Sequence, residues 1–352
     1  MLTGSFWILY LYDVAEEIRL EVLRPRPAGR EPAFRHPAPE YVRFQKPPVI
    51  EPLEPIDIGG ETLRGQIAWY EYGVVSVQLE RPFRFAWEDL VQFSSRWIAA
   101  PEIEARVGER VRQQLERVRT ALVNPYEQLL TEDYYVIRVD PQAGLTAAQL
   151  VEEHGPDIAR IVRAETGTLA DEERSEVLRA RMSYHPGDLL VAAWMAAFVY
   201  DTAEGAKPTI QLLEYANTQL LEFRHYDEVL TRRLAEVYRT MEQGTGWFSR
   251  WRLAREAGKL NAIRLDVHEL TERADTAIKF LSDMFSARLY QLAAVKVGVP
   301  DYRRLVDEKL HTAGELYQFM NERFHQSSAL VLELMVVVIL IIDLIYLFRG
   351  KA

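Results

Sequence analysis

The chain has 352 residues, of which 48% are hydrophobic and 27% charged, and its formal net charge is −10. This length and composition are typical of a folded protein with two domains, and the negative charge argues against a nucleic-acid partner. There is no cysteine, which excludes disulfides, thiolate zinc sites, iron–sulfur clusters and cysteine nucleophiles.

The N-terminal segment contains a short apolar run, Phe6 to Tyr12, followed at once by acidic residues. A secretory signal needs a basic region before a longer apolar core. We therefore interpret the run as a buried strand, and we expect the body of the protein to stay in the cytosol.

Residues 24–55 hold nine of the 17 prolines together with six basic residues. Proline fixes φ and lacks a backbone donor, so this stretch is predicted to be an extended surface loop. It is either a basic docking arm for an acidic partner or lipid headgroup, or a tolerated insertion.

Strand and helix patterns are mixed up to residue 142. Residues 65–83 alternate and predict a hairpin that turns at Tyr70 to Gly73, where glycine accepts a positive φ. Residues 101–122 carry one apolar stripe at helical spacing, and residues 134–139 read as another strand. Together they predict an α+β domain over residues 1–142.

Strand signals fade from Leu145 onward. Thr146 and Gln149 have the spacing of a helix capping box. Residues 188–200 are apolar nearly all round and too short to cross a membrane, so we expect them to form the most buried helix of the body.

Beyond Pro208 the apolar residues keep the 3–4 spacing of long helices that pack along a seam. We therefore predict a helical domain over residues 143–326 with an antiparallel coiled-coil stalk. The seam positions are Leu213, Ala216, Leu220, Phe223, Leu230, Leu234, Val237 and Met241 (with Asp227 interrupting), then Leu260, Ile263, Val267, Leu270, Ala274, Ala277, Leu281 and Met284, and finally Val306, Leu310, Ala313, Tyr317, Met320 and Phe324.

A mixed aromatic and basic cluster lies between the first two of these helices. Such a mixture suits a membrane interface or a protein partner, and it suits a packed helix–helix corner equally well. The cluster is Trp247, Phe248, Arg250, Trp251 and Arg252.

The C-terminal segment, residues 327–352, contains a 20-residue apolar stretch, Ala329 to Phe348, with two acids. As a helix it is about 30 Å long. Its 15 aliphatic and phenylalanine residues favour membrane insertion by about 5 to 9 kcal/mol, and the acids oppose it by at most about 6 kcal/mol. The hydropathy predicts a single-pass, tail-anchored protein that contacts lipid; a buried core helix is the alternative.

The two acids of this stretch, Glu333 and Asp343, are ten positions apart and about 80° apart around a helix. Acids within a span tend to face other helices, so we expect this segment to self-associate. The alternative is that each acid reaches toward an opposite headgroup layer. Arg349 and Lys351 follow the stretch as its basic flank.

No catalytic motif is evident in the sequence. The seven histidines are scattered, and there is no P-loop, dinucleotide glycine pattern or nucleophile elbow. We therefore expect no enzymatic activity, no cofactor and no metal.

Several short patterns resemble the "required for meiotic nuclear division" family of membrane-anchored proteins. They are Tyr72-Gly73-Val74-Val75 in the hairpin, Leu260-Asn261 with Arg264-Leu265-Asp266-Val267 (one residue longer between the halves), and Asn321-Glu322-Arg323 followed by Leu332-Glu333 and Asp343. The resemblance implies a non-enzymatic, single-pass protein that assembles at a membrane. It brings no catalytic residues.

Taken together, these patterns predict an α+β N-terminal domain, a long-helix coiled-coil or bundle region and one C-terminal transmembrane helix. The expected function is a membrane-tethered, homo-oligomeric scaffold that supports membrane or organelle organisation, with an unidentified protein partner. Two alternatives stay open: a channel-like ion-transport assembly with a cytosolic head, and a head-domain enzyme or ligand sensor. A buried polar cluster near the hairpin would favour the sensor.

Overall fold

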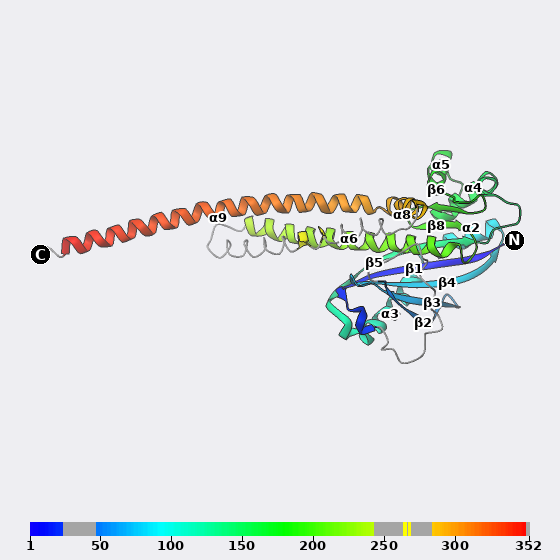
Figure 1. Ribbon diagram of the computed structural model, residues 1–352, viewed down its shortest axis with the longest axis horizontal. Coiled ribbons are helices and arrows are strands. Elements are labelled where there is room, and N and C mark those ends of the chain that lie inside the picture. The colour runs from blue at the N-terminus through cyan, green and yellow to red at the C-terminus, as the bar shows by residue number, and fades with distance from the viewer. Residues whose placement is uncertain (24–46, 243–262, 266, 269–283, 350–352) are drawn as a thin grey trace. The chain divides into compact units, whose positions relative to one another are not determined.

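The computed structural model of the chain describes residues 1–23, 47–242, 263–265, 267–268 and 284–349 (Figure 1). The chain divides into two compact units. The first comprises residues 1–225 and 271–302, and the second comprises residues 226–270 and 303–352.

The first unit is built on one eight-stranded sheet with the strand order β2-β3-β4-β1-β5-β8-β7-β6. Strand β1 lies at its centre and pairs antiparallel with both β4 and β5, whereas β5 and β8 are parallel. The strands are β1 (Leu2–Ile18), β2 (Val49–Ile58), β3 (Glu61–Trp69), β4 (Val74–Phe85), β5 (Leu122–Val139), β6 (Arg181–Met182), β7 (Leu189–Ala192) and β8 (Ala196–Tyr200).

Helices follow the strands in chain order. Those wholly within the first unit are α1 (Leu20–Leu23), α2 (Trp87–Trp97), α3 (Pro101–Arg117), α4 (Ala147–Arg163), α5 (Asp171–Arg179) and α8 (Met284–Val297), with a short 3-10 turn at Arg119–Ala121. Two longer helices, α6 (Ala206–Glu242) and α9 (Val299–Arg349), belong to both units.

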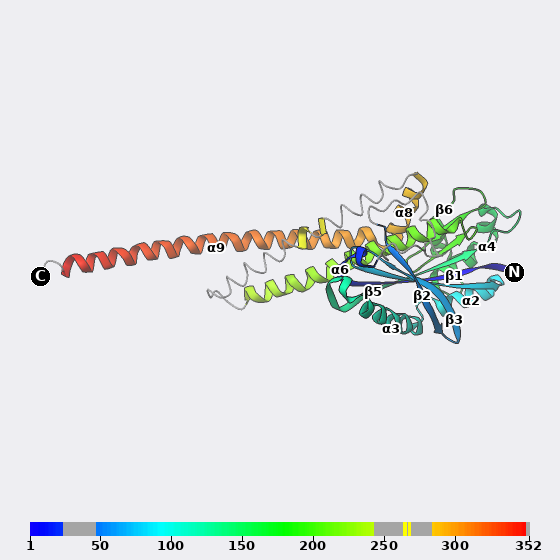
Figure 2. The same ribbon diagram turned by 60° about the horizontal axis from the view of Figure 1, so that its bottom comes forward.

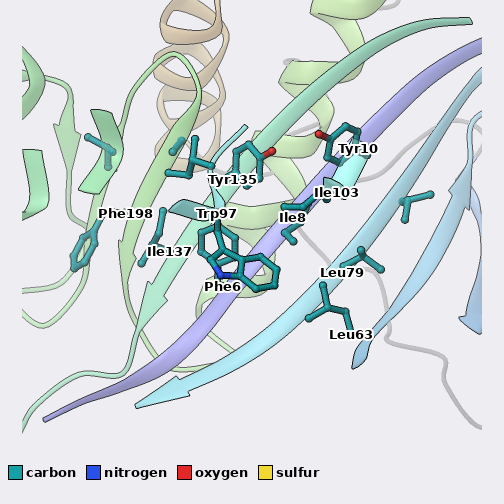
Figure 3. Close-up of a cluster of buried hydrophobic side chains, with 14 of the residues drawn as sticks. Phe6, Ile8, Tyr10, Leu63, Leu79, Trp97, Ile103, Tyr135, Ile137 and Phe198 are labelled. Atoms are coloured by element: carbon teal, nitrogen blue, oxygen red, sulfur yellow. The ribbon is translucent and has the colours of Figure 1, made fainter. Parts of the chain in front are cut away.

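One face of the sheet carries the main apolar core. Alternate residues of β1 point to this face because side chains on a strand alternate, and they meet α2 and α3 (Figure 3). Phe6 is fully buried, with the ring of Phe93 edge-on at 5.1 Å and that of Trp97 at 6.4 Å. Residues Ile8 and Tyr10 continue this row.

The opposite face of the sheet is covered by the first part of α6, which runs along it in both views (Figures 1 and 2). Side chains of α6 contact Gln78 of β4, Asp13 of β1 and Glu132 of β5. The central strands are therefore buried on both faces. This explains why both the odd- and the even-numbered residues of the run Phe6 to Tyr12 are apolar.

Two local predictions are confirmed. The hairpin turns at residues 70–73, where Gly73 has a φ of 91° and the Tyr70 amide donates to the Val74 carbonyl at 2.9 Å. The capping box is formed at α4, where the Thr146 side chain accepts from the Gln149 amide. Both depend on a few adjacent residues, which is why the sequence reveals them.

The predicted buried helix at residues 188–200 is wrong. These residues form the hairpin β7–β8, with Trp194 exposed at its turn. A run that is apolar in both parities fits a strand buried on two faces as well as a buried helix. The sheet consequently continues past residue 142, since β8 joins it beside β5.

The predicted fold class is corrected to a mixed α/β protein with an eight-stranded sheet. Among the residues described, no helix combines the length and apolar character that a membrane crossing requires. The transmembrane anchor at residues 327–352 and the single-pass, tail-anchored membrane location are therefore wrong. Hydropathy had treated residues 329–348 as a separate segment, but they are the last part of the 51-residue helix α9.

The second unit contains the remainder of α6 and most of α9. Lys309 of α9 contacts the Asp227 carboxylate and the Thr231 hydroxyl of α6, both at 2.6 Å. Most described residues of the predicted seam are buried on both helices, although Leu310 is only half-buried. Asp227, which interrupts the seam, is the partner of Lys309. These buried seam residues are Leu230, Leu234, Val237, Val306 and Ala313.

Candidate functional site: a polar layer beneath helix α6

A layer of buried polar side chains lies between the sheet and α6 in the first unit. On β4, residues of one parity face the apolar core, and the other parity supplies Ser76 and Gln78 to the layer. On α6, Glu214, Thr218 and Glu222 are four residues apart and therefore share one face. All five are buried, so the layer is polar on both sides.

Glu214 is the centre of this layer, with 2% of its surface exposed. Its Oε2 accepts a hydrogen bond from Gln78 Nε2 at 2.7 Å, and Gln78 Oε1 accepts from Gln66 Nε2 at 2.7 Å. Neither Glu214 Oε1 nor the Ser76 hydroxyl has a hydrogen bond of good geometry among the described residues. An amide chain thus leads from Gln66 of β3 through Gln78 to the Glu214 carboxyl group.

Burial raises the pKa of Glu214, because the charged form loses its hydration. The nearby Ser76, Gln78 and Tyr70 side chains lower the pKa again, but only in part. The balance favours the neutral carboxylic acid over a wider pH range than for an exposed glutamate.

The turn between β3 and β4 adds two tyrosines to this layer. Tyr72 donates to Thr218 Oγ1 at 2.9 Å, since the Thr218 hydroxyl itself donates to the Tyr215 carbonyl at 2.8 Å. Tyr70 lies beside Tyr72, with ring centroids 5.4 Å apart. Burial raises the pKa of both tyrosines well above its ordinary value, so both remain hydrogen-bond donors.

Two further carboxylates lie under α6, and each has a basic partner. Asp13 of β1 pairs with His225 at 2.5 Å, and Glu132 of β5 pairs with Arg224. Burial raises the pKa of both acids, and their partners oppose that rise. Glu214 differs because no basic side chain is among its interactions.

This arrangement offers polar groups but no recognisable catalytic set. Among the described residues, no three His, Asp or Glu side chains are placed to hold a metal ion. The chemistry that the layer supports is the binding of a proton or of a hydrogen-bonding group at Glu214.

The site residues expected from the sequence lie elsewhere. Glu333, Asp343 and Arg349 are part of α9. The remaining expected residues, Lys351 and the cluster Trp247, Phe248, Arg250, Trp251 and Arg252, lie outside the described residues. The sequence signal for the polar layer was the presence of Ser76 and Gln78 within the otherwise apolar first half of β4, and it was missed because Glu214 is 136 positions from Gln78.

Comparison with known proteins places the sheet in a family. Residues 3–207 match the family described as "Uncharacterized protein MJ0711, N-terminal domain", which is more than half of the chain, so the chain belongs to this family. The relative "Uncharacterized protein MJ0711" of Methanocaldococcus jannaschii is 18% identical over 195 residues, which cover 55% of this chain and 60% of the relative. No solved structure matches the chain.

The resemblance to the "required for meiotic nuclear division" family is therefore wrong. Its most specific pattern, around Glu333 and Asp343, lies beyond the matched residues 3–207. Its hairpin pattern has a local explanation, because the turn requires glycine at position 73.

Proposed function

We propose that this protein is a non-enzymatic scaffold that self-associates through α9. One observation carries the proposal: the seven consecutive aliphatic residues Val336 to Ile342 each keep between 45% and 61% of their surface exposed. A helix that is apolar all round is normally buried against something.

The heptad register identifies a second copy as the partner. The spacing that places Val306 and Ala313 against neighbours within the chain continues, with the polar Ser327 at one position, through Val338, Ile341 and Ile345. A continuous register is what allows two identical helices to interlock as knobs into holes. In a two-fold symmetric pair the same seam of each copy contacts the other, so no second type of surface is required.

The free energies of burial and association favour an interface of several helical turns over a single contact. Full burial of an aliphatic side chain contributes about 1.5–3 kcal/mol, and association costs about 4–15 kcal/mol in lost freedom. Five seam positions on each of two chains contribute about 15–30 kcal/mol, which exceeds that cost, whereas two positions on each chain contribute about 6–12 kcal/mol, which lies within its range. These five are Val331, Leu334, Val338, Ile341 and Ile345.

Sedimentation of the full-length chain tests this proposal. We expect a mass that is a fixed multiple of 40.7 kDa. The double variant V338E/I341E should reduce the mass to that of one chain, because it places charge on the seam. The matched control V336E/L340E changes two apolar residues of the same segment at heptad positions off the seam, and it should stay associated. A single-chain mass for the unaltered protein contradicts the proposal.

A second candidate function, ligand sensing by the first unit, is favoured by the buried Gln66–Gln78–Glu214 chain. Native mass spectrometry of the full chain, purified without added ligands, tests it. A small-molecule adduct that Q78L abolishes supports the sensor, and a bare chain at its sequence mass counts against it.

A further inference from the structure

Three of the carboxyl groups beneath α6 fall into two electrostatic situations. Asp13 and Glu132 each face a basic side chain, His225 and Arg224 respectively. Glu214 faces Gln78, Ser76 and Tyr70, none of which is basic. An ionised carboxylate in such a place is strongly disfavoured, and the usual response is to bind a proton.

We propose that a proton on Glu214 latches α6 to β4, and that loss of this proton loosens α6 from the sheet. In the neutral acid, Oε1–H can donate to the neighbouring Ser76 hydroxyl. The same proton removes the uncompensated charge. One proton therefore links a group on α6 to a group on β4.

The groups that face Glu214 support this assignment. The turn contributes Tyr70 and Tyr72, and β4 contributes Ser76 and Gln78; Tyr72 interacts in turn with Tyr215 and Glu222 of α6. Glu222 is acidic and the others are neutral polar groups, so none can replace the proton with a positive charge. Ionisation would leave a buried negative charge with no basic side chain among its interactions.

The sign of the pH dependence follows from the raised pKa of Glu214. Stabilisation by this group is fully present below the unfolded pKa of about 4.3 and is lost as pH rises through the folded pKa. Attachment of α6 should therefore weaken toward alkaline pH. This inference does not rest on pairing of α9, and it is measured on α6 alone.

Hydrogen exchange of the full chain tests the latch, followed on peptides from residues 210–224 and corrected for intrinsic exchange. In the unaltered protein, protection of these amides should fall by up to tenfold per pH unit above the folded pKa. E214Q, which mimics the neutral acid, should remove that slope. The control E228Q makes the same change at an exposed carboxylate of α6 and should keep it. A slope retained in E214Q overturns the proposal.

A second measurement covers the case in which E214Q does not fold. Infrared spectroscopy detects the C=O stretch of a neutral carboxylic acid. Ser76→Ala removes the proposed acceptor and should shift that band, while Asp13 and Glu132 are untouched. A band that does not shift, or no neutral-acid band at all, also overturns the proposal.

Discussion

Gly73 lies directly against the backbone carbonyl oxygen of Ala15: a Cβ placed on Gly73 would be 1.8 Å from that oxygen. The contact occurs where the β3–β4 turn meets β1, next to the irregularity between Asp13 and Ala15 in the pairing of β1 with β5. The Val14 amide donates to the Gly73 carbonyl at 3.0 Å. The turn therefore bonds to the central strand β1, in addition to connecting β3 with β4.

Gly73→Ala is expected to destabilise the first unit by more than about 2 kcal/mol. The substitution combines a left-handed φ, which costs about 1–2 kcal/mol in any L-residue, with a clash that only backbone movement relieves. Urea unfolding measures the loss. Gly144→Ala is the matched control, because its φ is 80° and nothing lies within 4 Å. Equal losses in the two variants would show that the contact with Ala15 is unimportant.

Phe6→Ala should lower the free energy of unfolding by about 3–5 kcal/mol, the usual cost of removing a buried aromatic side chain. Phe6 is fully buried among Phe93, Trp97 and Tyr135. Thermal unfolding followed by circular dichroism measures the effect. The control Tyr184→Ala removes an aromatic ring that is 65% exposed and should cost less than about 1 kcal/mol. A cost below that value for Phe6 would mean that this face is not the core.

The pair Asp227–Lys309 should contribute about 1 kcal/mol of coupling between α6 and α9, because both side chains are largely shielded from water. A double-mutant cycle with Asp227→Ala and Lys309→Ala measures this coupling. The comparison pair Glu228–Arg232 has both side chains more than half exposed and its charged atoms 3.7 Å apart, so its coupling should be close to zero. Coupling at Asp227 no larger than at Glu228 would contradict the assignment.

Local patterns predicted the parts of the fold that a few adjacent residues determine. The turn at Gly73, the capping box at Thr146 and the seam from Leu213 to Val237 are of this kind. In each, the residues that signal the structure also form it.

Features that depend on distant partners were not predicted. The sequence of β7 and β8 is compatible with a helix, and it forms strands because β8 pairs with the distant strand β5. Glu214 likewise resembles any other acid on a helix, and its special position depends on Gln78, which contacts it from β4. The hydropathy prediction of a membrane span at residues 329–348 was wrong for a similar reason. Hydropathy evaluates a segment by itself and takes no account of the longer helix α9 to which the segment belongs.

The family match ends at residue 207, close to the start of α6. It includes all eight strands apart from Leu2, but not the helix that covers one of their faces. A protein cut at that residue would expose Asp13, Ser76 and Gln78 to water, together with their apolar neighbours. The region recognised as homologous is thus smaller than the first compact unit, which extends through His225 and also includes residues 271–302, so an excised head should keep both segments.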